Sequence, residues 1–90
     1  MNKGELIDAV AGATGESKAT VGRILDATIE GITAAVAEGD KVSFTGFGTF
    51  ERRHRKARVG RNPQTGEEVK IAAANVPAFK AGKAFKDAVR

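Results

Sequence analysis

The densest chemical signal in the sequence is the run 52–61, in which six of the ten side chains are basic and none is acidic. Clustered lysines and arginines favour a polyanionic partner, because each cation can neutralise a phosphate. On a β-strand, side chains alternate between two faces. One face would carry Arg53 and Arg55, and the other would carry Arg52, Lys56 and Arg58. A ribbon that is cationic on both faces suits a groove of DNA better than a protein core.

The residues after this run predict the tip and the return strand of a β-ribbon. Residues 61–66 read Arg-Asn-Pro-Gln-Thr-Gly, which are turn formers, and alternating apolar residues follow at Val69, Ile71 and Ala73. The ribbon would therefore hold Pro63 at its tip. A proline in a turn ordinarily fixes the backbone and stiffens the loop. A tip proline is also placed to wedge between base steps and kink a duplex, and the residue pattern leaves both roles open.

Helical patterns precede the ribbon. Asn2, with Glu5 three residues later, predicts a capped helix start, and apolar residues then recur at helical spacing up to a stop at Gly15. Ser17 can cap a second helix, whose apolar line continues until the Gly-Asp pair at 39–40 ends it. Together the two segments predict an acidic helical hairpin with one apolar face.

Beyond the hairpin, the hydrophobic period changes from that of a helix to that of a strand. Residues 42–44 alternate in polarity, and a turn follows at 46–48. A long strand is then predicted from residue 49 to about residue 59. After the return strand, Asn-Val-Pro at 75–77 is expected to break the sheet, and residues 83–90 are expected to form a short last helix. The class predicted from these elements is α+β.

Charge and size point to a polyanionic partner and to self-association. Residues 1–40 carry three bases and seven acids, whereas residues 41–90 carry twelve bases and four acids. Such asymmetry indicates that one half reaches the polyanion. Ninety residues make one domain at most, with no cysteine and with five phenylalanines as the main large apolar side chains. This thin core predicts that the chain oligomerises to bury more apolar area.

No constellation in the sequence supports catalysis or metal binding. His54 is the only histidine, there is no cysteine, and Ser17 and Ser43 have no plausible base. The Gly-Phe-Gly at 46–48 lacks the further glycine and the lysine of phosphate-cradling loops. We therefore expect no enzymatic activity, no metal and no cofactor. No run approaches the roughly 20 apolar residues that span a bilayer, so we expect a cytoplasmic protein without a membrane partner.

Several short motifs are spread along the whole chain. They are Asn2-Lys3-x-Glu5-Leu6, Gly46-Phe47-Gly48-Thr49-Phe50, the spaced Arg55, Arg58 and Arg61, Gly60-Arg61-Asn62-Pro63-Gln64-Thr65-Gly66, Pro77-Ala78-Phe79-Lys80 and Gly82-Lys83. In this combination they resemble the bacterial histone-like HU family, whose relatives include integration host factor. The match covers essentially all 90 residues without gaps, and its combination of phenylalanines, spaced arginines and Asn-Pro is highly specific.

The resemblance implies an intertwined homodimer with an α+β fold. An N-terminal helical hairpin would be followed by a three-stranded antiparallel sheet, extended into a long β-ribbon arm, and by a short C-terminal helix. Residues 1–90 would form a single domain, with 1–40 as the helical dimerisation part, 41–76 as the sheet and DNA-binding arm, and 77–90 as the C-terminal helix. The dimer core would be packed by Phe44, Phe47, Phe50 and Phe79.

The resemblance also implies which residues contact DNA. The arm would supply Arg53, Arg55, Arg58, Arg61 and Lys70, with Pro63 as the intercalating tip. We expect Arg52, Lys56 and Asn62 to contact DNA as well. The body would add Lys3, Lys18, Lys80, Lys83 and Lys86. Of these, Arg52 and Lys56 are charges beyond the family's minimum.

The expected function is that of a histone-like architectural protein of the nucleoid. It would bind duplex DNA through the minor groove, largely without sequence specificity, and bend and compact it. DNA that is already bent, nicked or gapped should bind better, because part of the bending cost is already removed. One alternative is a sequence-specific architectural factor of the integration-host-factor type. Another is an RNA-binding protein, which is weaker because the sequence offers no aromatic stacking platform.

Overall fold

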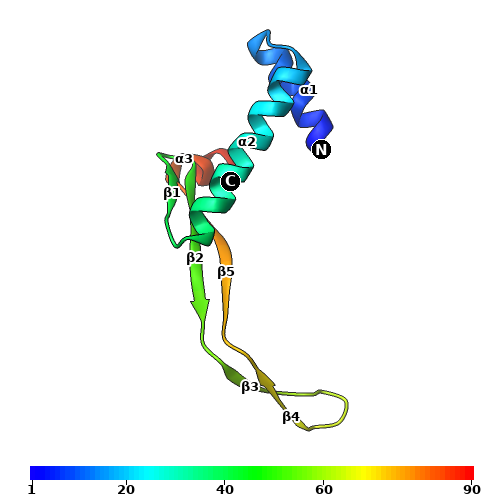
Figure 1. Ribbon diagram of the computed structural model, residues 1–90, viewed down its shortest axis with the longest axis vertical. Coiled ribbons are helices and arrows are strands. Elements are labelled where there is room, and N and C mark those ends of the chain that lie inside the picture. The colour runs from blue at the N-terminus through cyan, green and yellow to red at the C-terminus, as the bar shows by residue number, and fades with distance from the viewer. The chain divides into compact units, whose positions relative to one another are not determined.

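The computed structural model describes residues 1–90 and contains helices and antiparallel strands (Figure 1). Their order is α1 (Lys3–Thr14), α2 (Lys18–Ala37), β1 (Val42–Phe44), β2 (Gly48–Arg55), β3 (Arg58–Arg61), β4 (Glu68–Ile71), β5 (Ala74–Ala81) and α3 (Lys83–Val89). The chain divides into two compact units, Met1–Ala34 and Ala35–Arg90, each of which is described by itself. The predicted α+β class is confirmed. None of the helices combines the length and the apolar character needed to cross a membrane.

Local capping residues set the bounds of the helices in the first unit. The Asn2 side-chain oxygen accepts a hydrogen bond from the Glu5 amide at 2.9 Å, as the predicted cap requires. At the other end of α1, Gly15 takes a left-handed conformation with φ of 78°, which a glycine adopts without strain. The Ser17 hydroxyl accepts from the Thr20 amide at 3.1 Å at the start of α2. The predicted bounds of the hairpin helices are therefore confirmed.

The apolar faces of α1 and α2 are only partly covered within this unit. A β-carbon at Gly22 would lie 3.6 Å from the Ile7 side chain, so α1 passes close to this point of α2. Ala11 of α1 is buried, yet Leu6 and Ile24 remain 41% and 60% exposed. The hairpin therefore leaves apolar surface open.

In the second unit, β1, β2 and β5 form an antiparallel sheet in that order, with β5 at an edge. Directly opposed residues lie on the same face of such a sheet. The register places Phe50 opposite Phe79 on one face. On the other face, Thr49 lies opposite Ser43 of β1 and Lys80 of β5. The sheet thus has an apolar face and a polar face.

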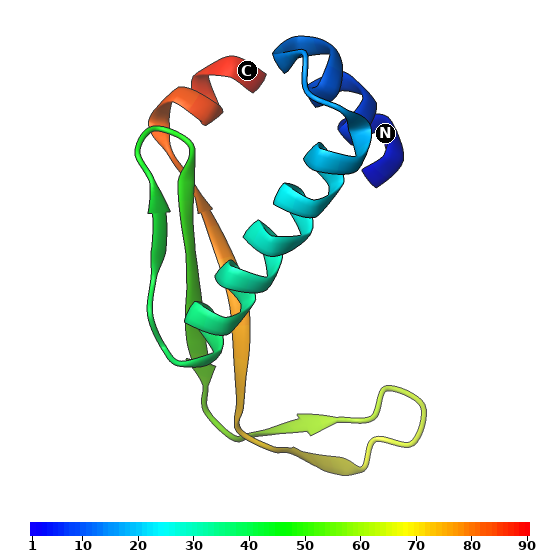
Figure 2. The same ribbon diagram turned by 45° about the horizontal axis from the view of Figure 1, so that its top comes forward.

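Five phenylalanine rings form one cluster on the apolar side. Ring centroids are 4.7 Å apart for Phe50 and Phe79, and 4.8 Å apart for the stacked pair Phe47 and Phe85. Gly48 permits this packing, because a β-carbon there would overlap the Phe79 ring. The Phe85 amide also donates to a carbonyl of the β1–β2 turn at 3.1 Å, which ties α3 to that end of the sheet (Figure 2).

The single long strand predicted over 49–59 is wrong. β2 ends at Arg55 and β3 begins at Arg58, while residues 56–57 and, on the return chain, residues 72–73 lie outside any strand. Figure 2 shows the outgoing and the returning segment bending together at this interruption. Beyond it, β3 and β4 form a separate two-stranded sheet. The return residues are alanines, which have low strand preference and little side chain for cross-strand packing, so the pairing lapses there.

The predicted break at residues 75–77 is also wrong. β5 runs from Ala74 to Ala81 without interruption, and Pro77 lies opposite Arg52 within it. A proline is tolerated because β5 is an edge strand, which has one side without ladder hydrogen bonds. Residues 77–81 therefore belong to the sheet, and not to the C-terminal helical part that was expected to begin at residue 77.

Candidate nucleic-acid interface

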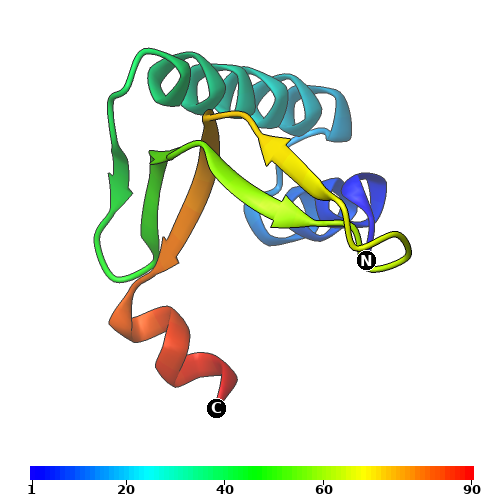
Figure 3. The same ribbon diagram turned by 90° about the horizontal axis from the view of Figure 1, so that it is seen from below.

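β3 and β4 form a two-stranded ribbon beyond the three-stranded sheet (Figure 3). Its antiparallel register places Arg61 and Lys70 on one face and Arg58 on the other. The predicted two-faced cationic ribbon is therefore present in these strands. The alternation predicted from Arg52 onward holds only as far as Arg55, where β2 ends.

Most cations of the second unit have no acidic partner. No ion pair forms at the exposed side chains of Arg55, Lys56, Arg58, Arg61, Lys70, Lys80, Lys83 and Lys86. An exposed cation without a partner in its own chain keeps its full capacity to neutralise a phosphate. These residues are therefore free to bind the phosphates of a polyanion.

Two lysines that were predicted to contact DNA form ion pairs within the helical unit. Lys3 forms an ion pair with Asp26, and Lys18 forms one with Asp8 at 3.2 Å. All four side chains are more than half exposed. Exposed pairs of this kind are worth only about 0–1 kcal/mol, so a phosphate can compete for the lysines. Each pair joins α1 to α2, which a sequence pattern does not reveal.

Arg52 lies on the opposite face of β2 from Arg53 and is engaged by the end of α2. Its guanidinium donates to the Ala37 carbonyl at 3.2 Å and lies against Gly39. α2 has no basic residue in its last turn, so Arg52 supplies the cation that complements the negative end of the helix dipole. Its contact with DNA stays a prediction.

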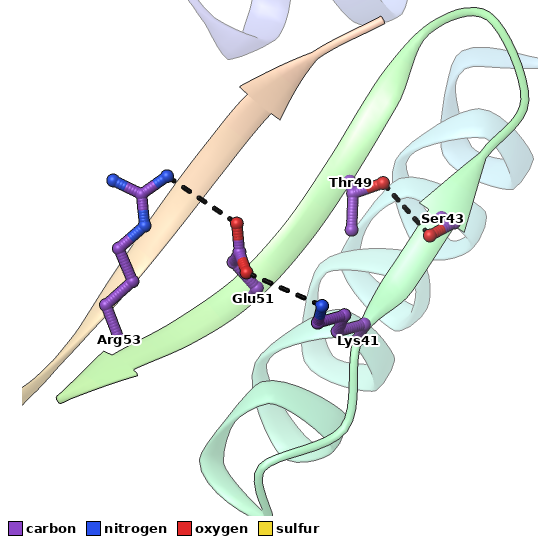
Figure 4. A network of polar contacts seen from close by, with 5 residues as sticks. All are labelled: Lys41, Ser43, Thr49, Glu51 and Arg53. Carbon is purple, nitrogen blue, oxygen red and sulfur yellow. Dashed lines mark hydrogen bonds and ion pairs between the residues drawn. The ribbon is translucent and has the colours of Figure 1, made fainter.

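A polar group that the sequence patterns did not single out is centred on Glu51 of β2, one residue beyond the last residue that pairs with β1 (Figure 4). The Glu51 carboxylate lies 3.5 Å from the Arg53 guanidinium and 3.9 Å from the Lys41 amine. Beside it, the hydroxyls of Ser43 and Thr49 share a hydrogen bond of 3.0 Å. The strand alternation that puts these side chains on the polar face was the available signal. On the same strand, the His54 ring bonds the side chain of a β5 asparagine at 3.0 Å.

Asn62 holds the turn at the tip of the ribbon. Its amide donates to the Glu67 carbonyl and its carbonyl accepts from the Gly66 amide, both at 2.8 Å. Its side-chain oxygen also accepts from the Gln64 amide at 2.9 Å. Pro63 follows in the turn and is exposed, so its predicted position at the tip is confirmed. Whether Asn62 and Pro63 touch DNA stays a prediction.

The aromatic residues predicted for a dimer core gather into one cluster but stay partly open. Phe44, Phe47 and Phe79 are 42%, 46% and 38% exposed. Phe50 joins them, as does Phe85 of α3, which was not among the residues predicted for the dimer core. No group of three or more His, Cys, Asp or Glu side chains is placed to hold a metal ion.

Comparisons with known proteins decide the family. The family model described as bacterial DNA-binding protein matches residues 1–90. The DNA-binding protein HU-beta of Pseudomonas aeruginosa is 61% identical over 89 residues, which is 99% of each chain. The chain belongs to the HU family. HU-alpha of Vibrio proteolyticus is 59% identical over all 90 residues of both proteins.

Solved HU structures share the fold. A cocrystal structure of Anabaena HU with DNA matches with a TM-score of 0.91 and 54% identity, over 99% of this chain and 97% of that one. HU from Thermotoga maritima matches with a TM-score of 0.71 and 40% identity over the full length of both chains. The resemblance to the HU family that the sequence motifs indicated is therefore confirmed.

Proposed function

We propose that this HU-family chain is a histone-like architectural protein that grips duplex DNA with its ribbon and bends it in the nucleoid of the cytoplasm. As a member of an architectural family, it is not an enzyme. The observation that carries the proposal is a set of exposed arm cations without an acidic partner, namely Arg55, Lys56, Arg58, Arg61 and Lys70. They lie on or beside a two-stranded ribbon, an element that fits a groove of DNA.

Affinity comes mainly from the release of counterions from the DNA backbone. Five unpaired arm cations in each chain of a homodimer neutralise up to about ten phosphates, which gives a slope of log affinity against log salt near −9. Body lysines extend the contact: Lys3, Lys18, Lys80, Lys83 and Lys86. The edges of the minor groove distinguish little beyond A·T from G·C, so binding is largely independent of sequence.

The bend comes from the tip of the ribbon. Pro63 is exposed in a turn whose backbone is fixed by the hydrogen bonds of Asn62, so it is presented on a stiff support. A proline inserted between base steps unstacks them at a cost of a few kcal/mol, which the wider contact with bent DNA offsets. DNA that is already bent, nicked or gapped avoids part of this cost and binds more tightly.

The active form is a homodimer in which residues 1–90 act as one domain. The single chain exposes 7250 Å², whereas a compact protein of this size exposes about 5,000 Å². The phenylalanine cluster is partly open, and an apolar groove of about 290 Å³ between α1 and α2 is lined by Leu6, Val10, Val21, Ile24 and Leu25. A second copy would bury these surfaces, which accounts for a chain with so little core of its own.

End-labelled duplexes of unrelated sequence test this function. Addition of the protein should raise energy transfer between the two ends, with similar affinity for each sequence. A strong preference for one sequence would favour the integration-host-factor type of protein instead. Binding without a change in energy transfer would contradict the bending part of the proposal.

A further inference from the structure

Lys41, Glu51 and Arg53 lie together because the strands place them on one face of the sheet. Glu51 and Arg53 are two residues apart on β2 and so share a face. On that same face Ser43, two residues after Lys41, lies opposite Thr49. Figure 4 shows Lys41 and Arg53 reaching the Glu51 carboxylate from opposite sides.

In this group the two cations are open to solvent and the carboxylate is not. The Glu51 side chain is 17% exposed, while those of Lys41 and Arg53 are 69% and 56% exposed. The separations of 3.9 Å and 3.5 Å are longer than the 2.7–2.9 Å typical of charge-assisted hydrogen bonds. Both ion pairs are therefore loose, and an anion that approaches from solvent meets the cations before it meets the carboxylate.

The group also continues the row of cations from the arm. Arg55 follows Arg53 on the same face of β2 and has no ion pair. Further along the same polar face, Lys80 lies opposite Thr49 and is unpaired as well. A cationic strip thus runs from the arm across the sheet, and a single carboxylate interrupts it.

We propose that Lys41 and Arg53 form a phosphate-binding site at the root of the arm, and that Glu51 weakens this site by holding both cations in the free protein. The ligand is a phosphodiester group of the duplex backbone, outside the segment that the ribbon grips. When the phosphate binds, it takes the place of the carboxylate beside the two cations. The inference rests on the proposed DNA binding and adds a residue, Lys41, to the DNA contacts.

Glu51→Gln tests whether Glu51 weakens phosphate binding, because the substitution removes the negative charge and keeps the shape of the side chain. Each of these loose ion pairs, whose cation is open to solvent, changes an equilibrium constant by at most about fivefold, and a dimer contains four of them. We expect duplex affinity to rise about threefold to tenfold, with a steeper salt slope. Glu38→Gln is the matched control, since Glu38 is exposed, has no ion pair and loses the same charge.

Lys41→Gln tests the site itself. Its loss should remove one phosphate contact per chain, and the salt slope of a dimer should become less steep by about 1.8. In the double variant, the gain from Glu51→Gln should shrink, because part of that gain acts through Lys41. The Lys41 side chain is largely exposed, so Lys41→Gln should fold normally. Its salt slope can therefore be measured even if Glu51→Gln lowers the unfolding temperature.

Two results would overturn the inference. Equal changes in affinity for Glu51→Gln and Glu38→Gln would show that Glu51 acts only through overall charge. An unchanged salt slope for Lys41→Gln would show that no phosphate reaches the site. If the wild-type protein bends DNA but these variants do not respond, only this site is refuted. If the wild-type protein binds no duplex at all, the proposed function fails and the site fails with it.

Discussion

Replacing Arg58 by alanine removes one exposed cation from each arm without disturbing another side chain. Arg58 makes no ion pair and no side-chain hydrogen bond, and it lies alone among the arm cations on its face of the ribbon. If it contacts one phosphate, the variant dimer neutralises two phosphates fewer. The slope of log affinity against log salt should then become less steep by about 1.8.

Fluorescence anisotropy of a labelled duplex, measured from 50 to 200 mM salt, gives this slope directly. Over such a fourfold range, a slope difference of about 1.8 changes the ratio of wild-type to variant affinity by about tenfold. Arg23→Ala is the matched control, because Arg23 is exposed on α2, has no ion pair and lies outside the predicted contacts. It loses the same charge and should leave the slope close to that of the wild type.

The control distinguishes a direct contact between Arg58 and a phosphate from a general effect of the protein's net charge. If Arg58→Ala and Arg23→Ala lower the affinity equally and neither changes the slope, the arm cations act only through net charge. The reasoning that joins an unpaired arginine to a particular phosphate would then be refuted.

Three further substitutions separate bending, stability and packing. Pro63→Ala should keep most of the affinity but reduce the bend; unchanged energy transfer between the duplex ends would rule out the wedge. Arg52→Ala should lower the free energy of unfolding by about 0.3–1 kcal/mol, through its lost contact with Ala37. Gly48→Ala should cost about 1–3 kcal/mol, because the added methyl group overlaps the Phe79 ring. A thermal midpoint equal to that of the wild type would contradict this packing argument.

Local signals in the sequence were enough to predict the helices and the tip. Asn2 and Ser17 cap their helices through bonds that span three residues, and Gly15 closes α1 within one turn. The turn at Pro63 likewise depends on neighbours within a few residues. Such interactions are readable because both partners are close together in the chain.

The errors and omissions come from partners that are distant in sequence. The strand around Pro77 was missed because tolerance of a proline depends on the strand's place at the sheet edge. The contact of Arg52 with the Ala37 carbonyl, 15 residues earlier in the chain, could not be seen in the sequence patterns. Glu51 drew no attention, because Lys41 is brought to it only by the pairing of β1 with β2.

A salt titration against two duplexes of identical sequence, one intact and one nicked at its centre, tests the bending clamp most directly. Bending an intact duplex costs of order 1–6 kcal/mol, and a nick removes part of that cost. We expect both duplexes to bind with a steep salt slope and the nicked one to bind more tightly. Equal affinity for the two would show a cationic coat that does not bend DNA, and it would contradict the role of Pro63.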